Sequence, residues 1–320
     1  LVPADALVYL ETNDLGAALQ TAKPKSDVAS LNGVQLAIAI TGIETAEQKL
    51  SDTQSNAQIK PKFVAVADTH TWNFYAVRFA EEKLGAFVEK VYGSKPTVDE
   101  PEHPGGGRDI VWTAADGRKA YAFVAGSIVY FSNDRDSLDK CLTRRDGHGD
   151  NLSKAGKVPV TPPDALASGY ISTPGVAQLA DLEGIRVAAS SDADPKVKSI
   201  VAAILPQIIR EMVTDITWTA KKIDTGVEDT YQIRMPDNVA AALKGTRPVD
   251  LDLRLRNMLI ALLSDSKLDT ETTTQVADVI AAAAKPSDST KTHFSPTGME
   301  RATTSDNGLI AAILAEIVTQ

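Results

Sequence analysis

The residues with the clearest potential for chemistry are three consecutive glycines followed by an arginine. They stand in the segment HPGGGRD and are Gly105, Gly106, Gly107 and Arg108. Backbone N–H groups of glycines and a guanidinium are donors that bind anions. However, no helix is predicted directly after the segment, and neither GxxxxGK[ST] nor GxGxxG occurs in the chain. We therefore favour a flexible connector here, and keep these four residues as an anion-binding candidate, which is the alternative.

Other residue types that carry chemistry are scattered. The four histidines are His70, His103, His148 and His293. None is three or four residues from another, so the zinc-binding patterns HExxH and HxxxH are absent. No GxSxG occurs, and two SxxK matches lack convincing SDN and KTG partners. The sequence thus predicts no catalytic residue, no metal site and no cofactor.

A single cysteine and several acidic residues have structural explanations. Cys141 has no partner for an intrachain disulfide or a thiolate metal site. Its spacing from Leu138 and Leu142 predicts a small core residue on a helix. Asp134 and Asp136 fall in the first turn of that helix, where the helix dipole favours negative charge. A calcium loop would need a glycine that is missing here.

The composition limits the class of protein. The 320 residues are 43% hydrophobic, which is enough for sizeable cores and excludes wholesale disorder. The formal net charge is −9. A negative surface repels phosphates, so we expect no nucleic-acid partner. No apolar run reaches the ~18 residues that a membrane span needs.

Two short phrases recur and predict an internal duplication. Asp5-Ala6-Leu7 recurs as Asp164-Ala165-Leu166, and Tyr75-x-x-Arg78 recurs as Tyr231-x-x-Arg234, in the same order and at similar offsets. We therefore predict two degenerate copies of one unit, in residues 1–150 and 151–320, joined by a Gly- and Pro-containing linker around 145–162. The first copy is strand-rich and the second helix-rich.

Periodicity predicts the elements that would position any site. Alternating or apolar runs predict strands at 6–12, 33–41, 63–68, 72–79, 109–114, 119–125 and 127–132. The pair 63–68 and 72–79 reads as a hairpin, and Asp116-Gly117 predicts another. Helices are expected at 81–91, 197–213, 251–263, 272–284 and 309–317. A further helix is expected to begin after a cap at Ser132 or Asn133. Strands grouped as hairpins, with helices between the groups, indicate an α+β fold with mainly antiparallel sheet.

Two phrases resemble a family. The opening LVPADALVYLETNDL and the later KAYAFVAGSIVYFSNDRDSLDKCL are similar to an uncharacterised family of bacterial exported or membrane-anchored proteins. The resemblance implies an extracytoplasmic location, in the periplasm or at the cell surface, and supplies no catalytic residue. Because the chain begins at Leu1, we expect that a cleaved signal or a membrane anchor precedes it.

Three functions follow as hypotheses. The first is a non-enzymatic binding or structural module of the cell envelope with a protein partner, such as an accessory subunit of a membrane-associated assembly. The second is a carrier of a lipid or another apolar ligand, held by the Ile- and Leu-rich helices of the second half. The third is a hydrolase whose site is assembled from distant residues, which would leave no local motif.

Overall fold

The computed structural model describes residues 2–22, 31–51, 54–103, 106–156, 161–162, 164–264, 266–285, 289–306 and 308–309; for residues 22, 45–51 and 54–59 it describes the backbone only. The described part is α+β with antiparallel strand pairs, which confirms the predicted fold class. The chain forms two compact units. Unit 1 comprises residues 1–170, 219–227 and 306–320, and unit 2 comprises residues 171–218 and 228–305.

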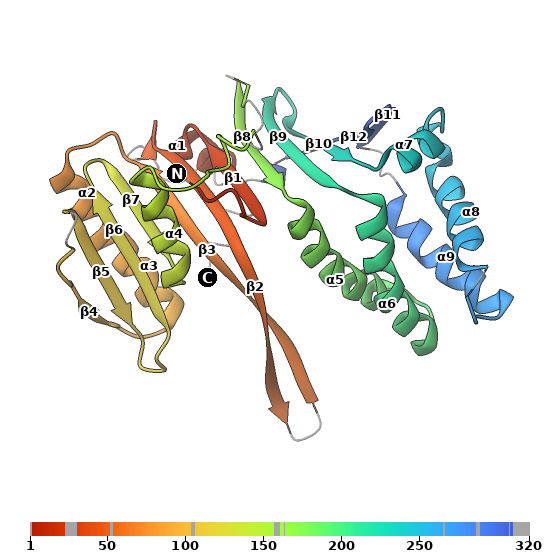
Figure 1. The fold of residues 1–320 in the computed structure, drawn as a ribbon, viewed down its shortest axis with the longest axis horizontal. Helices are drawn as coiled ribbons and strands as arrows, with labels where there is room; N and C mark the ends of the chain where they lie inside the picture. Colours follow the sequence, from red (N-terminus) through yellow and green to blue (C-terminus); the bar gives the residue numbers. More distant parts are fainter. Residues whose placement is uncertain are drawn as a thin grey trace. The chain divides into compact units, whose positions relative to one another are not determined.

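Unit 1 is built on a sheet with helices packed against it (Figure 1). Its strands, in the order of the sheet, are β8 (Ala165–Ile171), β1 (Val8–Thr12), β2 (Gln35–Ser51), β3 (Gln54–Asp68), β7 (Ile128–Ser132), β6 (Lys119–Ala125), β5 (Arg108–Thr113) and β4 (Thr97–Asp99). Its helices are α1 (Leu15–Ala22), α2 (Asn73–Phe79), a π-helical turn (Ala80–Leu84), α3 (Gly85–Tyr92) and α4 (Arg135–Arg145).

The strands predicted at 109–114, 119–125 and 127–132 are confirmed as β5, β6 and β7, which form an antiparallel meander. Its first turn is closed by hydrogen bonds between Ala114 and Arg118 and between Ala114 and Gly117. Gly117 has a φ of 87°, which is the left-handed conformation that a tight hairpin turn requires. The Asp116-Gly117 signal therefore predicted the position of this hairpin correctly.

The meander separates two cores of unit 1. Phe123 and Tyr130 lie opposite each other on β6 and β7 and pack with Leu138 and Cys141 of α4. The alternate residues of the same strands pack on the other face against α2 and α3, with Trp112 at the centre. Because side chains alternate along a strand, one meander supports a helical layer on each face. Figure 1 shows α4 on one side and α2 and α3 on the other.

The prediction of a hairpin between 63–68 and 72–79 is wrong. Residues 73–79 form helix α2, and β3 instead pairs with β2 and β7. The aromatic residues of this segment favour a strand by propensity. Ala76, Val77 and Ala80 are nevertheless buried together on one helical face against the sheet, and this packing outweighs the propensity.

The error removes half of the sequence support for a duplication. Tyr75 lies on helix α2 and is exposed, whereas Tyr231 lies on strand β10 (Gly226–Arg234) and is half-buried. The Asp-Ala-Leu phrases do agree, since each leads into a strand and then a helix. The strand orders β1-β2-β3-β7-β6 and β8-β9-β10-β12-β11 also follow one pattern. Duplication, with its division at 150/151, stays a prediction.

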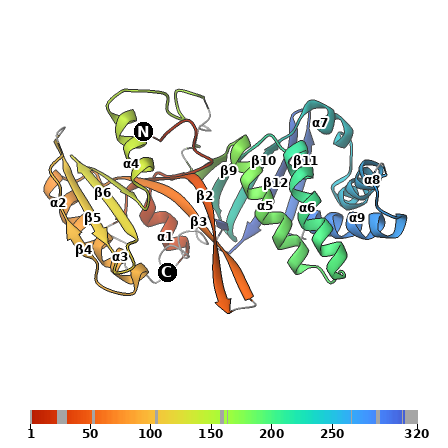
Figure 2. The same cartoon turned by 60° about the horizontal axis from the view of Figure 1, so that its bottom comes forward.

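Strands β2 and β3 continue past their neighbours as a two-stranded ribbon, which Figure 2 shows extending from the sheet of unit 1. β1 pairs with β2 only over residues 36–40, and β7 pairs with β3 only over residues 64–68. Residues 42–51 and 54–62 therefore pair with each other alone in the described structure. We call this segment the β2–β3 ribbon.

Unit 2 combines helices with a small group of strands. Its helices are α5 (Thr173–Ser190), α6 (Pro195–Met212), α7 (Asp237–Leu243), a 3₁₀ turn (Pro248–Asp250), α8 (Leu251–Leu263) and α9 (Thr270–Ala284). Its strands are β11 (Thr290–Ser295), β12 (Gly298–Ser305), β10 and β9 (Asp215–Ile223), in that order in the sheet. The hairpin of β9 and β10 contributes residues 219–227 to unit 1.

The helices predicted in the second half are confirmed at three places. α6 begins at Pro195 after Asp194, whose carboxylate accepts hydrogen bonds from the N–H groups of Lys196 and Val197. α6, α8 and α9 bury their apolar stripes in one core with α5. The predicted helix at 309–317 lies outside the described residues from position 310 on. No helix in the described ranges has both the length and the apolarity to cross a bilayer.

Candidate functional site

The predicted anion-binding loop is only partly described. Gly105 lies outside the described residues, and Gly106 and Gly107 have φ values of 75° and 99°. The guanidinium of Arg108 lies 2.7 Å from a carboxylate oxygen of Glu81 and 2.6 Å from one of Glu100. Anion binding here stays a prediction, and any anion would compete with these two carboxylates for Arg108.

His103 next to this loop pairs with a buried carboxylate. Its Nδ1 lies 3.0 Å from Oδ2 of Asp109, and the other oxygen, Oδ1, lies 3.5 Å from a guanidinium nitrogen of Arg135 on α4. The His103 ring also packs on Phe123. No serine hydroxyl joins this pair in the part of the chain that the structure describes. The pair fixes the loop and α4 to β5, and the hydrolase hypothesis gains no nucleophile from it.

The other histidines and Cys141 provide no metal site in the described part of the chain. The described residues contain no group of three or more His, Cys, Asp or Glu side chains that could hold a metal ion. Cys141 is fully buried, as predicted for a core residue. Burial raises the pKa of its thiol to about 12, so the thiol stays protonated at neutral pH. Its burial and its protonated thiol give Cys141 a packing role.

A carboxylate surrounded by hydroxyls joins strands β1 and β8 of unit 1. Glu11 on β1 accepts hydrogen bonds from the hydroxyls of Tyr9 at 2.6 Å, of Ser168 at 3.0 Å and of Thr161. Burial and the neighbouring Glu11 raise the pKa of Tyr9 far above its usual value. The hydroxyl of Thr12 donates to the carbonyl of Leu166 at 2.7 Å. We interpret this cluster as a structural bond between β1 and β8.

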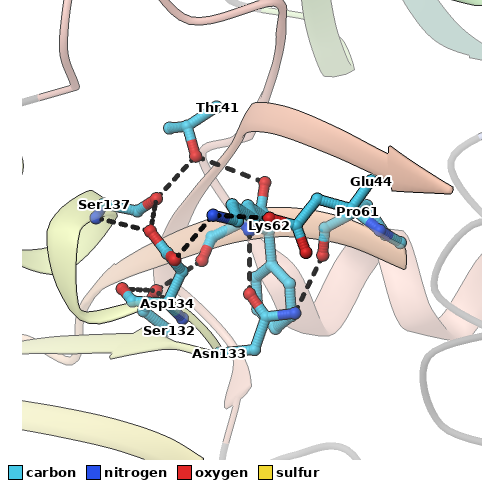
Figure 3. Close-up of polar contacts among 9 residues, drawn as sticks. Thr41, Glu44, Pro61, Lys62, Ser132, Asn133, Asp134 and Ser137 are labelled. Atoms are coloured by element: carbon cyan, nitrogen blue, oxygen red, sulfur yellow. Dashed lines mark hydrogen bonds and ion pairs between the residues drawn. The ribbon is translucent and has the colours of Figure 1, made fainter. Parts of the chain in front are cut away.

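Asp134 caps α4, which corrects the predicted cap at Ser132 or Asn133. Its Oδ2 accepts hydrogen bonds from the amide of Ser137 at 2.9 Å and from the hydroxyl of Ser137 at 2.7 Å (Figure 3). The Ser137 hydroxyl also lies 2.6 Å from the hydroxyl of Thr41 on β2. Ser132 and Asn133 cannot cap the helix because they bond to the backbone of β3.

Figure 3 shows that the same network reaches the base of the β2–β3 ribbon. The ammonium of Lys62 lies 2.8 Å from Glu44 and 3.3 Å from Oδ1 of Asp134. The Asn133 amide donates to the carbonyl of Pro61 at 2.8 Å. These side chains connect strands β2 and β3 with α4, and we interpret them as stabilising the base of the ribbon.

This network predicts a pH-dependent stability. Burial by itself would raise the pKa of Asp134, but the hydrogen bonds from Ser137 and the contact with Lys62 outweigh it and hold that pKa below its usual value. A carboxyl with a lowered folded-state pKa stabilises the fold above its unfolded pKa of about 3.9, and this contribution is lost as the pH falls through the folded value. We expect the difference in free energy of unfolding between wild type and Asp134→Asn to be about 1 kcal/mol at pH 7 and to shrink below pH 4.

Urea denaturation at pH 7, 5 and 3.5 measures this difference. Asp136→Asn is the control, because Asp136 is exposed in the same helical turn and its replacement removes a charge without removing these contacts. A wild-type advantage over Asp134→Asn that stayed constant down to pH 3.5 would contradict the role given to the Asp134 charge.

The most exposed aromatic side chains of the described structure are adjacent in sequence. Trp72, Phe74 and Tyr75 at the start of α2 are 83%, 69% and 58% exposed. The rings of Phe74 and Tyr75 contact each other edge to face, with centroids 5.7 Å apart. Large apolar side chains grouped at the surface mark binding sites more often than scattered ones do. We call these three residues the aromatic surface.

An apolar cavity adjoins the aromatic surface. It has a volume of about 150 Å³ and is lined by Leu31, Val34, Thr69, Thr71, Tyr75 and Phe79. Val34 is buried, whereas Thr71 and Tyr75 are exposed, so the cavity leads from the surface inward. We call it the Tyr75 cavity. All of its lining residues belong to unit 1.

The turn before the aromatic surface is held in a strained conformation. His70 has a φ of 50°, and it is the only non-glycine residue with positive φ in the described structure. The Thr69 hydroxyl lies 2.7 Å from that of Thr71 and 2.8 Å from the carbonyl of Ser127, and the His70 amide donates to Asp68. Strain of this kind is retained where surrounding bonds fix it, and it often occurs at binding sites.

The predictions from sequence missed the aromatic surface. The signal was present as the run Trp72-Asn73-Phe74-Tyr75, directly after a turn. Assigning this run to a strand placed alternate aromatic residues in a core. In the helix that forms instead, Ala76 and Val77 are buried and the aromatic residues before them face solvent.

Comparisons with known proteins add a distant structural likeness only. The sequence matches no family model and no curated protein, so its resemblance to an exported family stays a prediction. Solved structures of TP0453 are similar. Crystal form III has a TM-score of 0.45 and 9% identity over 98% of this chain and 96% of that one. Form IV has a TM-score of 0.42 and 9% identity over 98% and 94%, and form I has 0.42 and 8% over 99% and 95%. Likenesses at this level support no statement about function.

Proposed function

We propose that this chain is a non-enzymatic binding module of the bacterial cell envelope, and that unit 1 holds a protein partner through the aromatic surface. The supporting observation is the exposure of Trp72, Phe74 and Tyr75 beside the Tyr75 cavity. Aromatic side chains bury about 150–250 Å² each when they are covered. At about 25 cal/mol per Å², covering even part of three such rings contributes several kcal/mol to association.

The aromatic surface has the composition of an interface centre. Trp and Tyr are among the residues that contribute most to binding energy at protein interfaces. Single exposed apolar residues elsewhere, such as Val249 and Leu253 of unit 2, have no aromatic neighbour in their part of the sequence. The extracytoplasmic location in this proposal is supported by the sequence resemblance alone.

A carrier of an apolar ligand is the second candidate. A groove of about 670 Å³ in unit 2 lies between the end of α5, the connection from α5 to α6 and helix α9, and its volume is that of a small-molecule site. However, Asp192, Asp194 and Asp278 are among its lining residues. Carboxylates are poor neighbours for an acyl chain. The α5, α6, α8 and α9 stripes fill their shared core with their own side chains. The protein-binding proposal is therefore better supported.

Photo-crosslinking from Phe74 tests the protein-binding proposal. Benzoylphenylalanine at position 74, in a chain expressed with an export signal, is expected to give discrete adducts with a partner protein. Trp72→Ala in the same chain should reduce their yield at least about tenfold, because it removes a large part of the apolar contact.

The matched control places benzoylphenylalanine at Leu253, which is also exposed but lies on α8 of unit 2. Equal adduct yields at positions 74 and 253, or none at position 74, would contradict the proposal. Trp72→Ala should leave the free energy of unfolding within about 0.5 kcal/mol of wild type, since a surface substitution removes few contacts.

A further inference from the structure

The Tyr75 cavity is apolar in its chemistry although two threonines line it. The hydroxyls of Thr69 and Thr71 lie 2.7 Å apart, and that of Thr69 also donates to the carbonyl of Ser127. These hydroxyls are therefore already hydrogen-bonded, to each other and to Ser127. The remaining lining side chains are Leu31, Val34, Tyr75 and Phe79. A ligand group in this cavity would meet mainly carbon atoms, and it would need no polar atoms of its own.

The volume of the cavity selects a small occupant. Cavities of about 150 Å³ lined by apolar side chains hold a molecule of the size of benzene. Sites for lipids and other larger ligands start at about 300 Å³. The Tyr75 cavity, at about 150 Å³, therefore suits one leucine or phenylalanine side chain. Such a side chain would come from a protein segment covering the adjoining rings of Trp72 and Phe74.

The charge at the edge of the Tyr75 cavity indicates the charge of the residues that flank the bound side chain. Asp68 directly precedes the turn, is partly exposed, and accepts a hydrogen bond from the His70 amide. Burial raises the pKa of the Asp68 carboxyl, but hydrogen bonds from His70 and Ser127 outweigh this and lower it, so Asp68 is ionised at neutral pH. The whole chain carries a net charge of −9. Both charges attract a basic segment and repel an acidic one.

We propose that the Tyr75 cavity binds one apolar side chain, of leucine or phenylalanine size, from a peptide segment that carries a lysine or arginine close to this anchor. The inference rests on the proposed protein-binding function and specifies the partner. The rings of Trp72 and Phe74 would cover the peptide on one side of the anchor, and Asp68 would pair with its basic residue.

A display library of random 12-residue peptides, selected on the wild-type chain, tests this inference. The enriched peptides are expected to share a Leu, Phe or Met with a Lys or Arg nearby. Changing the apolar residue of a synthetic peptide to alanine should weaken binding about 10- to 100-fold. Asp68→Asn keeps the acceptor oxygen for His70 and should weaken binding a few-fold, with a smaller dependence on salt.

A variant that fills the Tyr75 cavity tests most directly whether the cavity is the binding site. Leu31→Phe adds volume at a half-buried lining residue. It should weaken binding of the peptide at least about tenfold. Leu253→Ala, at an exposed position of unit 2, is the control and should bind as wild type does. Benzene, followed by NMR of the Val34 methyl groups, measures cavity occupancy in the wild-type chain without any variant.

The outcomes separate this inference from the proposed function. Peptides whose binding requires Trp72 and Phe74, but which bind Leu31→Phe as tightly as wild type, would contradict the Tyr75 cavity as the binding site. The proposed protein-binding function would still hold. Enriched peptides without a shared apolar residue, or with acidic flanks, would do the same. If no peptide is enriched while Phe74 gives no crosslinked partner, the function and the inference both fail. Loss of binding in Leu31→Phe, with benzene shifting Val34 in wild type, supports the inference.

Discussion

Replacing Trp112 by alanine is expected to lower the free energy of unfolding of unit 1 by about 3–5 kcal/mol. Trp112 on β5 is only 2% exposed and is the largest of the fully buried side chains. It packs with Val88 of α3 and contacts the ring of Phe131, with centroids 6.2 Å apart. Alanine would leave a cavity between the meander and its helices that the rigid sheet cannot close.

Far-UV circular dichroism in urea measures this effect without depending on tryptophan fluorescence. Trp72→Ala is the matched control, because it removes the same side chain from a position that is 83% exposed. We expect the control to change the free energy of unfolding by no more than about 0.5 kcal/mol. Since the chain has two compact units, the transition of unit 1 has to be fitted separately. Similar losses for the two variants would contradict the assignment of Trp112 to the core.

Gly298→Ala is expected to destabilise unit 2 by about 3 kcal/mol or more. Gly298 closes the turn between β11 and β12 with a φ of 148°, a conformation that L side chains rarely adopt. A Cβ at this position would lie 2.0 Å from the carbonyl oxygen of Ile233 on β10. Backbone on both sides has to move, which also disturbs the hydrogen bond from the Met235 amide to the Thr297 carbonyl.

Gly245→Ala is the control for a glycine with positive φ but without a clash. Gly245 in the same unit has a φ of 80°, but no atom of the described residues lies within 4 Å of its added Cβ. Its replacement should therefore cost only about 1–2 kcal/mol. The difference between the two variants in thermal unfolding of unit 2 gives the combined cost of the contact with Ile233 and of the less accessible φ at Gly298. Equal losses would contradict the large cost expected for Gly298→Ala.

Much of the fold could be predicted because local signals and packing agree. Asp116-Gly117 placed the hairpin between β5 and β6, and the apolar spacing at 197–213, 251–263 and 272–284 placed α6, α8 and α9 within a few residues. At these positions the turn chemistry, the periodicity and the buried face require the same structure.

The errors occur where tertiary contacts decide between local options. The 72–79 segment has strand-forming residues, but the burial of Ala76 and Val77 selects a helix. Ser132 is a good cap by composition, yet its hydroxyl bonds to the carbonyl of Phe63, and Asp134 caps α4 instead. Neither contact can be read from the chain near these residues.

The candidate site was not predicted because it depends on this same error. In a strand, alternate residues of the run from Trp72 to Tyr75 would be buried, so the exposure of all three rings could not be expected. The cavity beside them also needs Leu31 and Val34, which are about forty residues away in sequence. Only the structure brings these residues together.

The β2–β3 ribbon implies that this protein needs protection from self-association. Over residues 42–51 and 54–62 neither strand has a second neighbour in the described structure, so both outer backbone edges can accept a strand of another molecule. The sequence of these edges contains the means to discourage that, since Pro61 lacks an amide hydrogen and charges recur at Glu44, Glu47, Lys49 and Lys60. Apolar substitutions in this stretch would therefore lower the solubility of the protein before they lower the stability of its fold.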